Sequence, residues 1–128
     1  MKTVSPVVAL LAVLVLSGCP QVSDPQTELE KAVKDLQKRL PWKVDEYTTC
    51  KEIRAGDLEI IYVYEVSGIA DSNIKSNAAT LKQGVAQGLK ANIGSLRPYV
   101  KHDIAMKYVY KNKKGEELVS FTLHPAKL

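Results

Sequence analysis

Alternation of apolar and polar residues is the feature of this sequence that most restricts its fold. In residues 58–66 every second side chain is apolar or aromatic, and these are Leu58, Ile60, Tyr62, Tyr64 and Val66. Because successive side chains of a strand point to opposite faces, the pattern predicts a strand with one buried face. Residues 104–111 and 118–124 alternate in the same way on either side of an Asn-Lys-Lys-Gly turn, which predicts a hairpin.

Two further segments follow the helical period instead. Residues 27–40 place Leu29, Val33 and Leu36 on one stripe, with Thr27 and Glu30 in capping-box spacing and Pro41 as the stop. Residues 77–93 repeat apolar side chains every four positions, and Asn77 is the expected cap.

Glycines interrupt the second predicted helix at two places four residues apart. Gly84 and Gly88 lower the helix propensity, but they would share one face and permit close approach to a sheet. Residues 44–55 are rich in Val, Thr, Tyr and Ile and predict another strand, joined to 58–66 by a turn at 55–57.

The predicted order of elements is α-β-β-α-β-β. Strands joined as hairpins pair antiparallel, so the sequence predicts an α+β fold: an antiparallel sheet of about four strands with two helices packed on one face. The length allows one domain, which we place at residues 27–128.

The N-terminus has the parts of an export signal. Lys2 is followed by an uncharged apolar run at residues 6–16, which is shorter than the roughly 20 residues of a membrane-spanning helix. Leu16-Ser17-Gly18-Cys19 then resembles the lipobox of bacterial lipoproteins. The resemblance implies that residues 1–18 are removed as a signal peptide and that Cys19 receives a diacylglycerol and an N-acyl chain. The alternative is an ordinary signal peptide with a chance cysteine.

Residues 19–26 would then be a polar, proline-bounded tether between the membrane and the domain. Several acyl chains hold a protein stably on a membrane without any spanning helix. Pro20 follows the cysteine, in place of the aspartate associated with inner-membrane retention in enteric bacteria. We therefore expect a location outside the cytoplasm, at the periplasmic face of an outer membrane.

The order of the domain's motifs resembles a family of small exported proteins named for quorum-sensing-regulated virulence factors. The resemblance covers about residues 29–123 and rests on Leu40-Pro41, the Tyr62-Val63-Tyr64 strand, Leu96-Arg97-Pro98 and the final hairpin from Lys107 to Phe121. It implies the same α+β fold and a link to virulence, and it implies no active-site residues.

Catalytic and metal chemistry have little support in the sequence. No Gly-x-Ser-x-Gly motif, phosphate loop or His-Glu-x-x-His motif occurs, and His102 and His124 stand without a neighbouring nucleophile or ligand set. The basic residues behind the net charge of +4 are spread along the chain, whereas a surface that binds nucleic acid gathers them into a patch. We expect a protein that is not an enzyme, with no cofactor beyond the acyl chains on Cys19.

Five side chains are candidates for interaction. Tyr62, Tyr64, Tyr108 and Tyr110 would share one sheet face if their strands pair, either as core beneath the helices or as an exposed platform for a partner. Cys50 is either a small, half-buried residue or a thiol that pairs with another protein.

We therefore expect a membrane-anchored interaction or accessory module that binds an envelope protein of unknown identity through its sheet face or an exposed edge. The alternative is a carrier or sensor of a small apolar ligand such as a lipid. The ligand would lie between the second predicted helix and the sheet, where Gly84 and Gly88 reduce the packing. A cavity lined by Tyr and Leu would favour the alternative, and a filled core with an exposed aromatic edge would favour the module.

Overall fold

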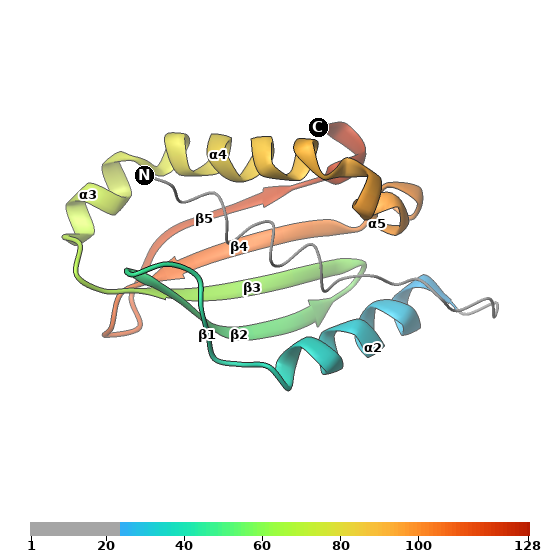
Figure 1. Cartoon of the computed structure of the whole chain (residues 1–128), viewed down its shortest axis with the longest axis horizontal. Helices are drawn as coiled ribbons and strands as arrows, with labels where there is room; N and C mark the ends of the chain where they lie inside the picture. The colour runs from blue at the N-terminus through green and yellow to red at the C-terminus, as the bar shows by residue number, and fades with distance from the viewer. Residues whose placement is uncertain (1–23) are drawn as a thin grey trace.

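The computed structural model describes residues 24–128, which fold into one sheet and a layer of helices (Figure 1). The strands are β1 (Trp42–Lys43), β2 (Thr48–Gly56), β3 (Glu59–Val66), β4 (Ala105–Lys111) and β5 (Glu117–Leu123). The helices are α2 (Pro25–Gln37), α3 (Asp71–Ser76), α4 (Ala78–Ala91) and α5 (Arg97–Lys101), with short 3-10 segments η1 (Ile93–Leu96) and η2 (Pro125–Lys127).

The sheet has five strands in the order β1-β2-β3-β4-β5 and is mixed, so the prediction of a four-stranded antiparallel sheet was wrong. All neighbours pair antiparallel except β3 and β4, which are parallel. The reason is the long helical connection between β3 and β4, which returns the chain to the end of the sheet where β3 begins. The α+β class is confirmed.

The strand predicted at residues 44–55 begins at Thr48, because the residues before it form a turn. The backbone N–H of Val44 donates to the carbonyl of Thr48 at 2.8 Å, and the N–H of Tyr47 donates to Asp45 Oδ1 at 2.8 Å. This turn reverses the chain after β1, so that the short β1 becomes the fifth strand.

The helix boundaries also differ from those predicted. Asp24 is the N-cap of α2, and its carboxylate accepts from the N–H of Thr27 at 3.2 Å, so the helix begins inside the predicted tether. The second predicted helix corresponds to α4, and a further helix, α3, precedes the predicted range. Asn77 lies between them, and its side-chain amide donates back to the carbonyl of Asn73 and caps no N–H. Pro98 occupies the first turn of α5, where a proline needs no N–H donor.

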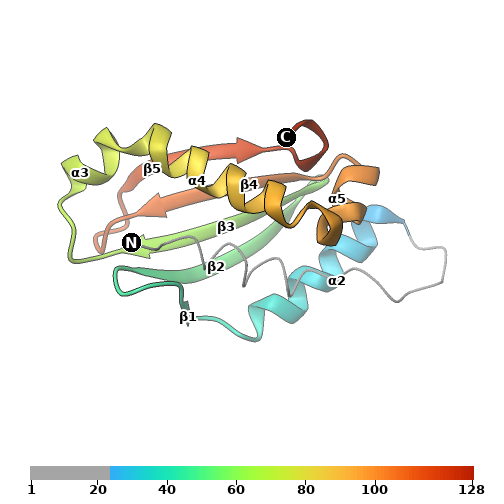
Figure 2. The same ribbon diagram turned by 45° about the horizontal axis from the view of Figure 1, so that its top comes forward.

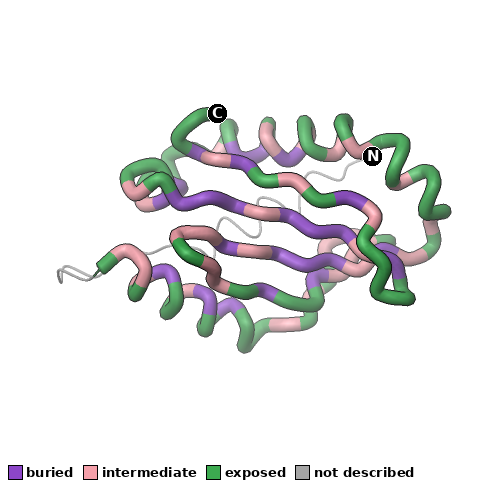
Figure 3. The backbone as a smooth tube through the Cα atoms, turned by 180° about the vertical axis from the view of Figure 1, so that it is seen from behind, coloured by how far each residue is buried: buried purple, intermediate pink, exposed green. Residues whose placement is uncertain are grey.

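The helices α2, α4 and α5 lie on one face of the sheet, with α2 beside β2 and α4 across the β4–β5 side (Figures 1 and 2). This confirms the prediction that the helices share a face. Figure 3 shows the opposite face from behind, with no helix in front of the strands. No helix of residues 24–128 is long and apolar enough to cross a membrane.

One side chain of α2 fastens the helix to the β2–β3 turn. The Gln26 amide donates to the carbonyl of Gly56 at 2.7 Å and accepts from the N–H of Leu58 at 2.7 Å. The buried stripe of α2, Leu29, Val33 and Leu36, packs into the same core. Together these contacts fix α2 along the β2 side of the helix-covered face.

Candidate binding cavity

Stacked aromatic rings lie across the helix-facing side of β3 and β4. The parallel register places Tyr62 beside Tyr108 and Tyr64 beside Tyr110, with ring centroids 5.3 Å and 4.9 Å apart. The prediction that these four tyrosines share one face is confirmed. Phe121 of β5 extends the row at 5.4 Å from Tyr108, and we call these five rings the aromatic row.

The tyrosines of the aromatic row are buried. Their exposed fractions run from 0 % for Tyr62 to 8 % for Tyr110. Burial raises the pKa of each tyrosine well above its ordinary value of 10, because the phenolate would lie in an apolar surrounding. These side chains therefore stay neutral at physiological pH and form the floor beneath the helix layer.

A cavity of about 460 Å³ lies between one end of this floor and the helices α3 and α4. Its volume falls within the range of roughly 300–1,000 Å³ that is usual for ligand sites. The β1–β2 turn, β3, β4 and the two helices contribute the lining residues, which are Val44, Asp45, Tyr47, Thr48, Tyr64, Val66, Ile69, Asn73, Ile74, Asn77, Thr80, Leu81, Gly84, Val85 and Tyr110.

Gly84 is part of the reason why this space stays open. A Cβ built on Gly84 would meet no atom within 4 Å, so this glycine does not bring α4 into close contact with the sheet. The prediction of close approach was wrong at Gly84, where the missing side chain leaves room. Gly88, one turn later, is buried.

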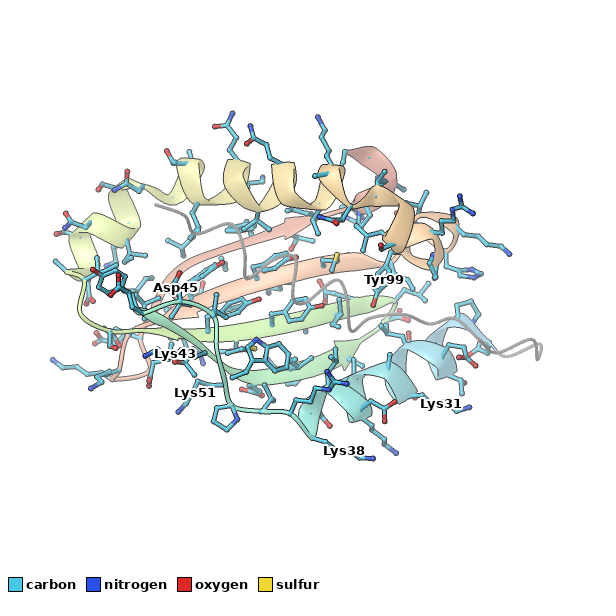
Figure 4. The ribbon with its side chains drawn as sticks, viewed as in Figure 1. Lys31, Lys38, Lys43, Asp45, Lys51 and Tyr99 are labelled. Atoms are coloured by element: carbon cyan, nitrogen blue, oxygen red, sulfur yellow. The ribbon has the colours of Figure 1, made fainter. Side chains whose placement is uncertain are left out.

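The polar groups of the cavity lining are neutral or acidic. They include the side chains of Asp45, Asn73, Asn77 and Thr80, and no lysine or arginine contributes to the lining. The four lysines labelled in Figure 4 project outward from α2, β1 and β2, and all four are exposed. The lining therefore disfavours a carboxylate or phosphate as occupant, since a buried anion needs a cation or several strong donors.

Three tyrosine hydroxyls are buried without a hydrogen-bond partner among residues 24–128: those of Tyr62, Tyr99 and Tyr108. Tyr99 belongs to α5 and points from that helix toward the strands (Figure 4). The sequence analysis missed Tyr99 because Pro98 made residues 96–100 look like an irregular connector. Recognising a proline in the first turn of a helix would have exposed the signal.

Cys50 lies on the same face as the aromatic row, opposite Tyr64 in the ladder, and its side chain is fully buried. Burial raises the pKa of the thiol from 9.0 to about 12, so at neutral pH it is a protonated, unreactive group. A disulfide to another protein would require the sheet to open at this point. Cys19, the predicted lipidation site, lies outside the described residues.

Residues 24–128 hold no group of three or more His, Cys, Asp or Glu side chains that could bind a metal ion. His124 makes one contact with a carboxylate, at 3.5 Å from Asp103, and both side chains are well exposed. Neither histidine lines the cavity.

Residues 24–119 match a family profile described as a domain of unknown function (DUF8479). The chain belongs to this family. The comparison with curated protein sequences gave no significant match. The resemblance to the quorum-sensing-regulated family stays a prediction.

Two solved structures share the fold at low sequence identity. One is a protein of Pseudomonas aeruginosa described as secreted (PA3611), with a TM-score of 0.63 and 14% identity over 80% of this chain and 95% of that chain. The other is AspS, the type II secretion system pilotin of Vibrio cholerae, with a TM-score of 0.60 and 13% identity over 81% of this chain and 95% of that chain. At this identity the likeness establishes the fold.

Proposed function

We propose that this protein is a lipid-anchored, non-catalytic accessory module of the bacterial cell envelope that binds an apolar segment of another envelope protein. The observation that carries the accessory role is the likeness in fold to the pilotin AspS, and the cavity of about 460 Å³ floored by Tyr64 and Tyr110 is the site that we assign to the partner. Its apolar walls are Ile74, Leu81 and Val85 of the helices, facing Val66 of the sheet. Each square ångström of apolar surface removed from water contributes about 25 cal/mol, so a segment that fills the cavity has a sufficient source of affinity.

The proposed binding mode differs from the one expected from the sequence. Of the two alternatives for the four tyrosines, the structure has the core beneath the helices, where Tyr64 and Tyr110 line a cavity, and not the exposed platform. A partner would therefore insert side chains between α4 and the sheet. The pilotin AspS is by its name an accessory of a secretion system, and its likeness in fold supports an accessory role for this chain.

Anchoring belongs to the same proposal. Cleavage before Cys19 and acylation of that cysteine would leave a short tether before the N-cap Asp24, so the domain would stay close to the membrane. We place the anchor in an outer membrane, at its periplasmic face. Labelling cells with a radioactive or clickable palmitate should tag the wild-type chain and leave Cys19→Ala untagged. Equal labelling of the two chains would remove the anchor from the proposal.

Photo-crosslinking from the cavity rim tests the binding function. Tyr47 lines the cavity and is 42 % exposed, so p-azidophenylalanine can replace it with little change of shape. The matched control carries the same azide at Gln83, an exposed residue of α4 outside the lining. Illumination of intact cells should give one discrete protein adduct from position 47 and none from position 83.

A blocked cavity makes the crosslinking result specific. Gly84→Leu adds an isobutyl group that points into open space at the cavity, and it should abolish the adduct from position 47. Ala79→Leu adds a similar bulk to an exposed position of the same helix and should leave the adduct intact. An adduct that survives Gly84→Leu, or that forms equally from both azide positions, would mean that the cavity does not bind the partner.

The second candidate is a carrier or sensor of a small apolar ligand. The observation that favours it is the place of the cavity, between α4 and the sheet at Gly84, with Tyr64 and Leu81 in its walls. The crosslinking experiment separates the two candidates. Position 47 would then yield lipid adducts, detected by mass spectrometry of the intact chain, and no protein adduct.

A further inference from the structure

Acidic side chains are absent from one long segment of the domain. Basic residues are spread along the sequence, but no residue between Asp71 and Asp103 is an aspartate or a glutamate. The same segment carries five lysines and arginines, all of them exposed: Lys75, Lys82, Lys90, Arg97 and Lys101. The surface of this segment therefore has a positive charge that none of its own residues offsets, and such a surface attracts anionic partners.

Two exposed apolar side chains lie among the last three of these basic residues. Ile93 is 41 % exposed and Val100 is 38 % exposed, and among residues 24–128 the only other large apolar side chain so exposed is Tyr47 at the cavity. The last turn of α4, η1 and α5 carry these residues and lie together at one end of the domain (Figures 1 and 2). We call the following five side chains the basic patch: Lys90, Ile93, Arg97, Val100 and Lys101. A surface that combines cationic and apolar side chains is typical of proteins that lie on an anionic membrane.

A series of hydrogen bonds links the start of α2 to α5. The side chain of Gln26 accepts from the N–H of Leu58 at 2.7 Å, and the carbonyl of Leu58 accepts from the N–H of Ala105 at 3.0 Å. The N–H of the preceding residue, Ile104, donates to the carbonyl of Tyr99 in α5 at 2.9 Å. The start of α2 and the basic patch therefore lie at the same end of the sheet, where β3 and β4 begin (Figure 2).

The length of the tether determines how far this end can lie from a membrane. Five peptide units join Cys19 to the N-cap Asp24, and a fully extended chain of that length spans at most about 18 Å. An acyl anchor on Cys19 would therefore keep the start of α2 within about 18 Å of the lipid surface. The basic patch, at the same end of the domain, would come to the headgroups.

Acidic side chains at this end determine which of its sides can face the lipid. Asp24 and Asp57 are exposed, and they lie at the start of α2 and in the β2–β3 turn. Asp103 follows α5, and its carboxylate is 3.5 Å from Nδ1 of His124. Anionic headgroups therefore attract the α5 side of this end and repel the side formed by α2 and the turn.

We propose that the basic patch docks on the anionic phospholipid headgroups of the membrane that holds the anchor, with Ile93 and Val100 inserted between them. This inference rests on the anchoring in the proposed function and adds an orientation to it. Because β3 and β4 are parallel, the cavity at Tyr64, Val66 and Tyr110 lies at the ends of these strands that are farther from the patch. The docked domain would hold the cavity away from the lipid, where a protein partner can reach it.

Vesicle binding of the unacylated mature chain tests the patch apart from the anchor. The chain carries Cys19→Ala, and the vesicles contain phosphatidylcholine and phosphatidylglycerol in equal parts. Cosedimentation at low salt should show binding that falls steeply as salt is added and that is absent with pure phosphatidylcholine. Each basic residue near an anionic membrane contributes about fivefold to the affinity, so the triple variant with Lys90→Gln, Arg97→Gln and Lys101→Gln should bind about a hundredfold more weakly.

A matched triple variant controls for the loss of charge. Lys75→Gln, Lys113→Gln and Lys114→Gln remove three exposed lysines from the opposite end of the domain, at α3 and the β4–β5 turn (Figure 1). This variant should bind the vesicles nearly as tightly as the wild type. Equal losses in the two triple variants, or no binding of the wild type at low salt, would overturn the inference.

Quenching by labelled lipids tests the orientation of the acylated chain in the same vesicles. A fluorophore attached at Val100→Cys should be quenched by lipids that carry a nitroxide on the headgroup, whereas one attached at Ser72→Cys, an exposed position of α3, should not. Cys50 is fully buried, so it does not compete for the label. Equal quenching at the two positions would refute the docked orientation.

The outcomes separate this inference from the proposed function. If palmitate labels Cys19 but positions 100 and 72 are quenched equally, the anchor stands and the inference is refuted. If palmitate labels the wild type and Cys19→Ala equally, the anchor is refuted, and vesicle binding alone decides whether the patch docks on lipid. If the patch variant binds vesicles like the wild type but loses the protein adduct from position 47, the patch binds an acidic protein and the inference is overturned.

Discussion

Substitution of Gly84 tests directly whether there is open space between α4 and the sheet at this position. A Cβ at this position meets no atom within 4 Å, and the residue lies in the interior of the helix. Glycine in a helix interior is less favourable than alanine by about 1 kcal/mol, since it has more backbone freedom to lose on folding. Gly84→Ala should therefore raise the free energy of unfolding by about 0.5–1 kcal/mol.

The larger substitution measures the open space itself. Gly84→Leu gains the same helix propensity and adds three further carbons, each worth up to about 0.8 kcal/mol when buried among apolar groups. The total gain should reach about 2 kcal/mol, because the new side chain faces Tyr64, Leu81 and the other apolar lining residues. For a domain of about 100 residues, each 1 kcal/mol corresponds to a rise in Tm of roughly 4–8 °C.

Urea unfolding of the mature Cys19→Ala chain, followed by circular dichroism, provides the measurement. Ala79→Leu is the control, because it places the same side chain on an exposed part of α4 and should change the stability by less than about 0.5 kcal/mol. A loss of stability of 1 kcal/mol or more in Gly84→Ala would mean that α4 packs against the sheet at this point. The reasoning about the cavity, and the proposed function with it, would then fail.

Three further predictions concern the stability of the fold. Gln26→Ala removes two hydrogen bonds of 2.7 Å between α2 and the β2–β3 turn, so it should lower the free energy of unfolding in urea by about 1–3 kcal/mol. The exposed control Gln83→Ala should lower it by less than about 0.5 kcal/mol. Equal effects of the two substitutions would mean that Gln26 does not hold α2 to the turn. Leu36→Ala empties a fully buried position and should cost about 2–5 kcal/mol, and a value below 1 would place α2 outside the core. The pKa of Cys50 is raised by burial, so the folded chain keeps its thiol proton at pH values where the unfolded chain loses it. The thiol's contribution to the free energy of unfolding should therefore be fully present below pH 9 and should fall above it, by up to about 1.4 kcal/mol per pH unit until about pH 12. If the stability of Cys50→Ala falls as steeply with pH as that of the wild type, this reasoning is wrong.

Local patterns in the sequence sufficed for part of the candidate site. Alternation placed Tyr62 and Tyr64 on one face of their strand, and it did the same for Tyr108 and Tyr110, because the pleat of a strand fixes which side chains share a face. The apolar stripe of residues 27–40 likewise indicated which face of α2 is buried. These features depend only on neighbours along the chain.

The direction of pairing lay beyond the reach of those patterns. The sequence predicted hairpins on both sides of the helical connection, but it gave no signal for a parallel contact between β3 and β4. Alternation is the same for either direction of pairing, and only the path of the intervening helices decides which one forms. The turn that separates β1 from β2 depended likewise on one Asx-type turn at Asp45.

The sequence by itself determined the α+β class, the shared face of the four tyrosines and the position of a candidate lipidation site at Cys19. Tertiary structure alone decided that Gly84 faces open space, that Tyr99 lies near Tyr62 and Tyr108, and that the hydroxyls of these tyrosines have no hydrogen-bond partner among residues 24–128. The physical reason is that a cavity, or a hydroxyl without a partner, depends on how several segments that are distant in the sequence pack together. Periodicity reports only which side a residue faces, whereas the distance between α4 and the sheet is set by the packing of the whole layer.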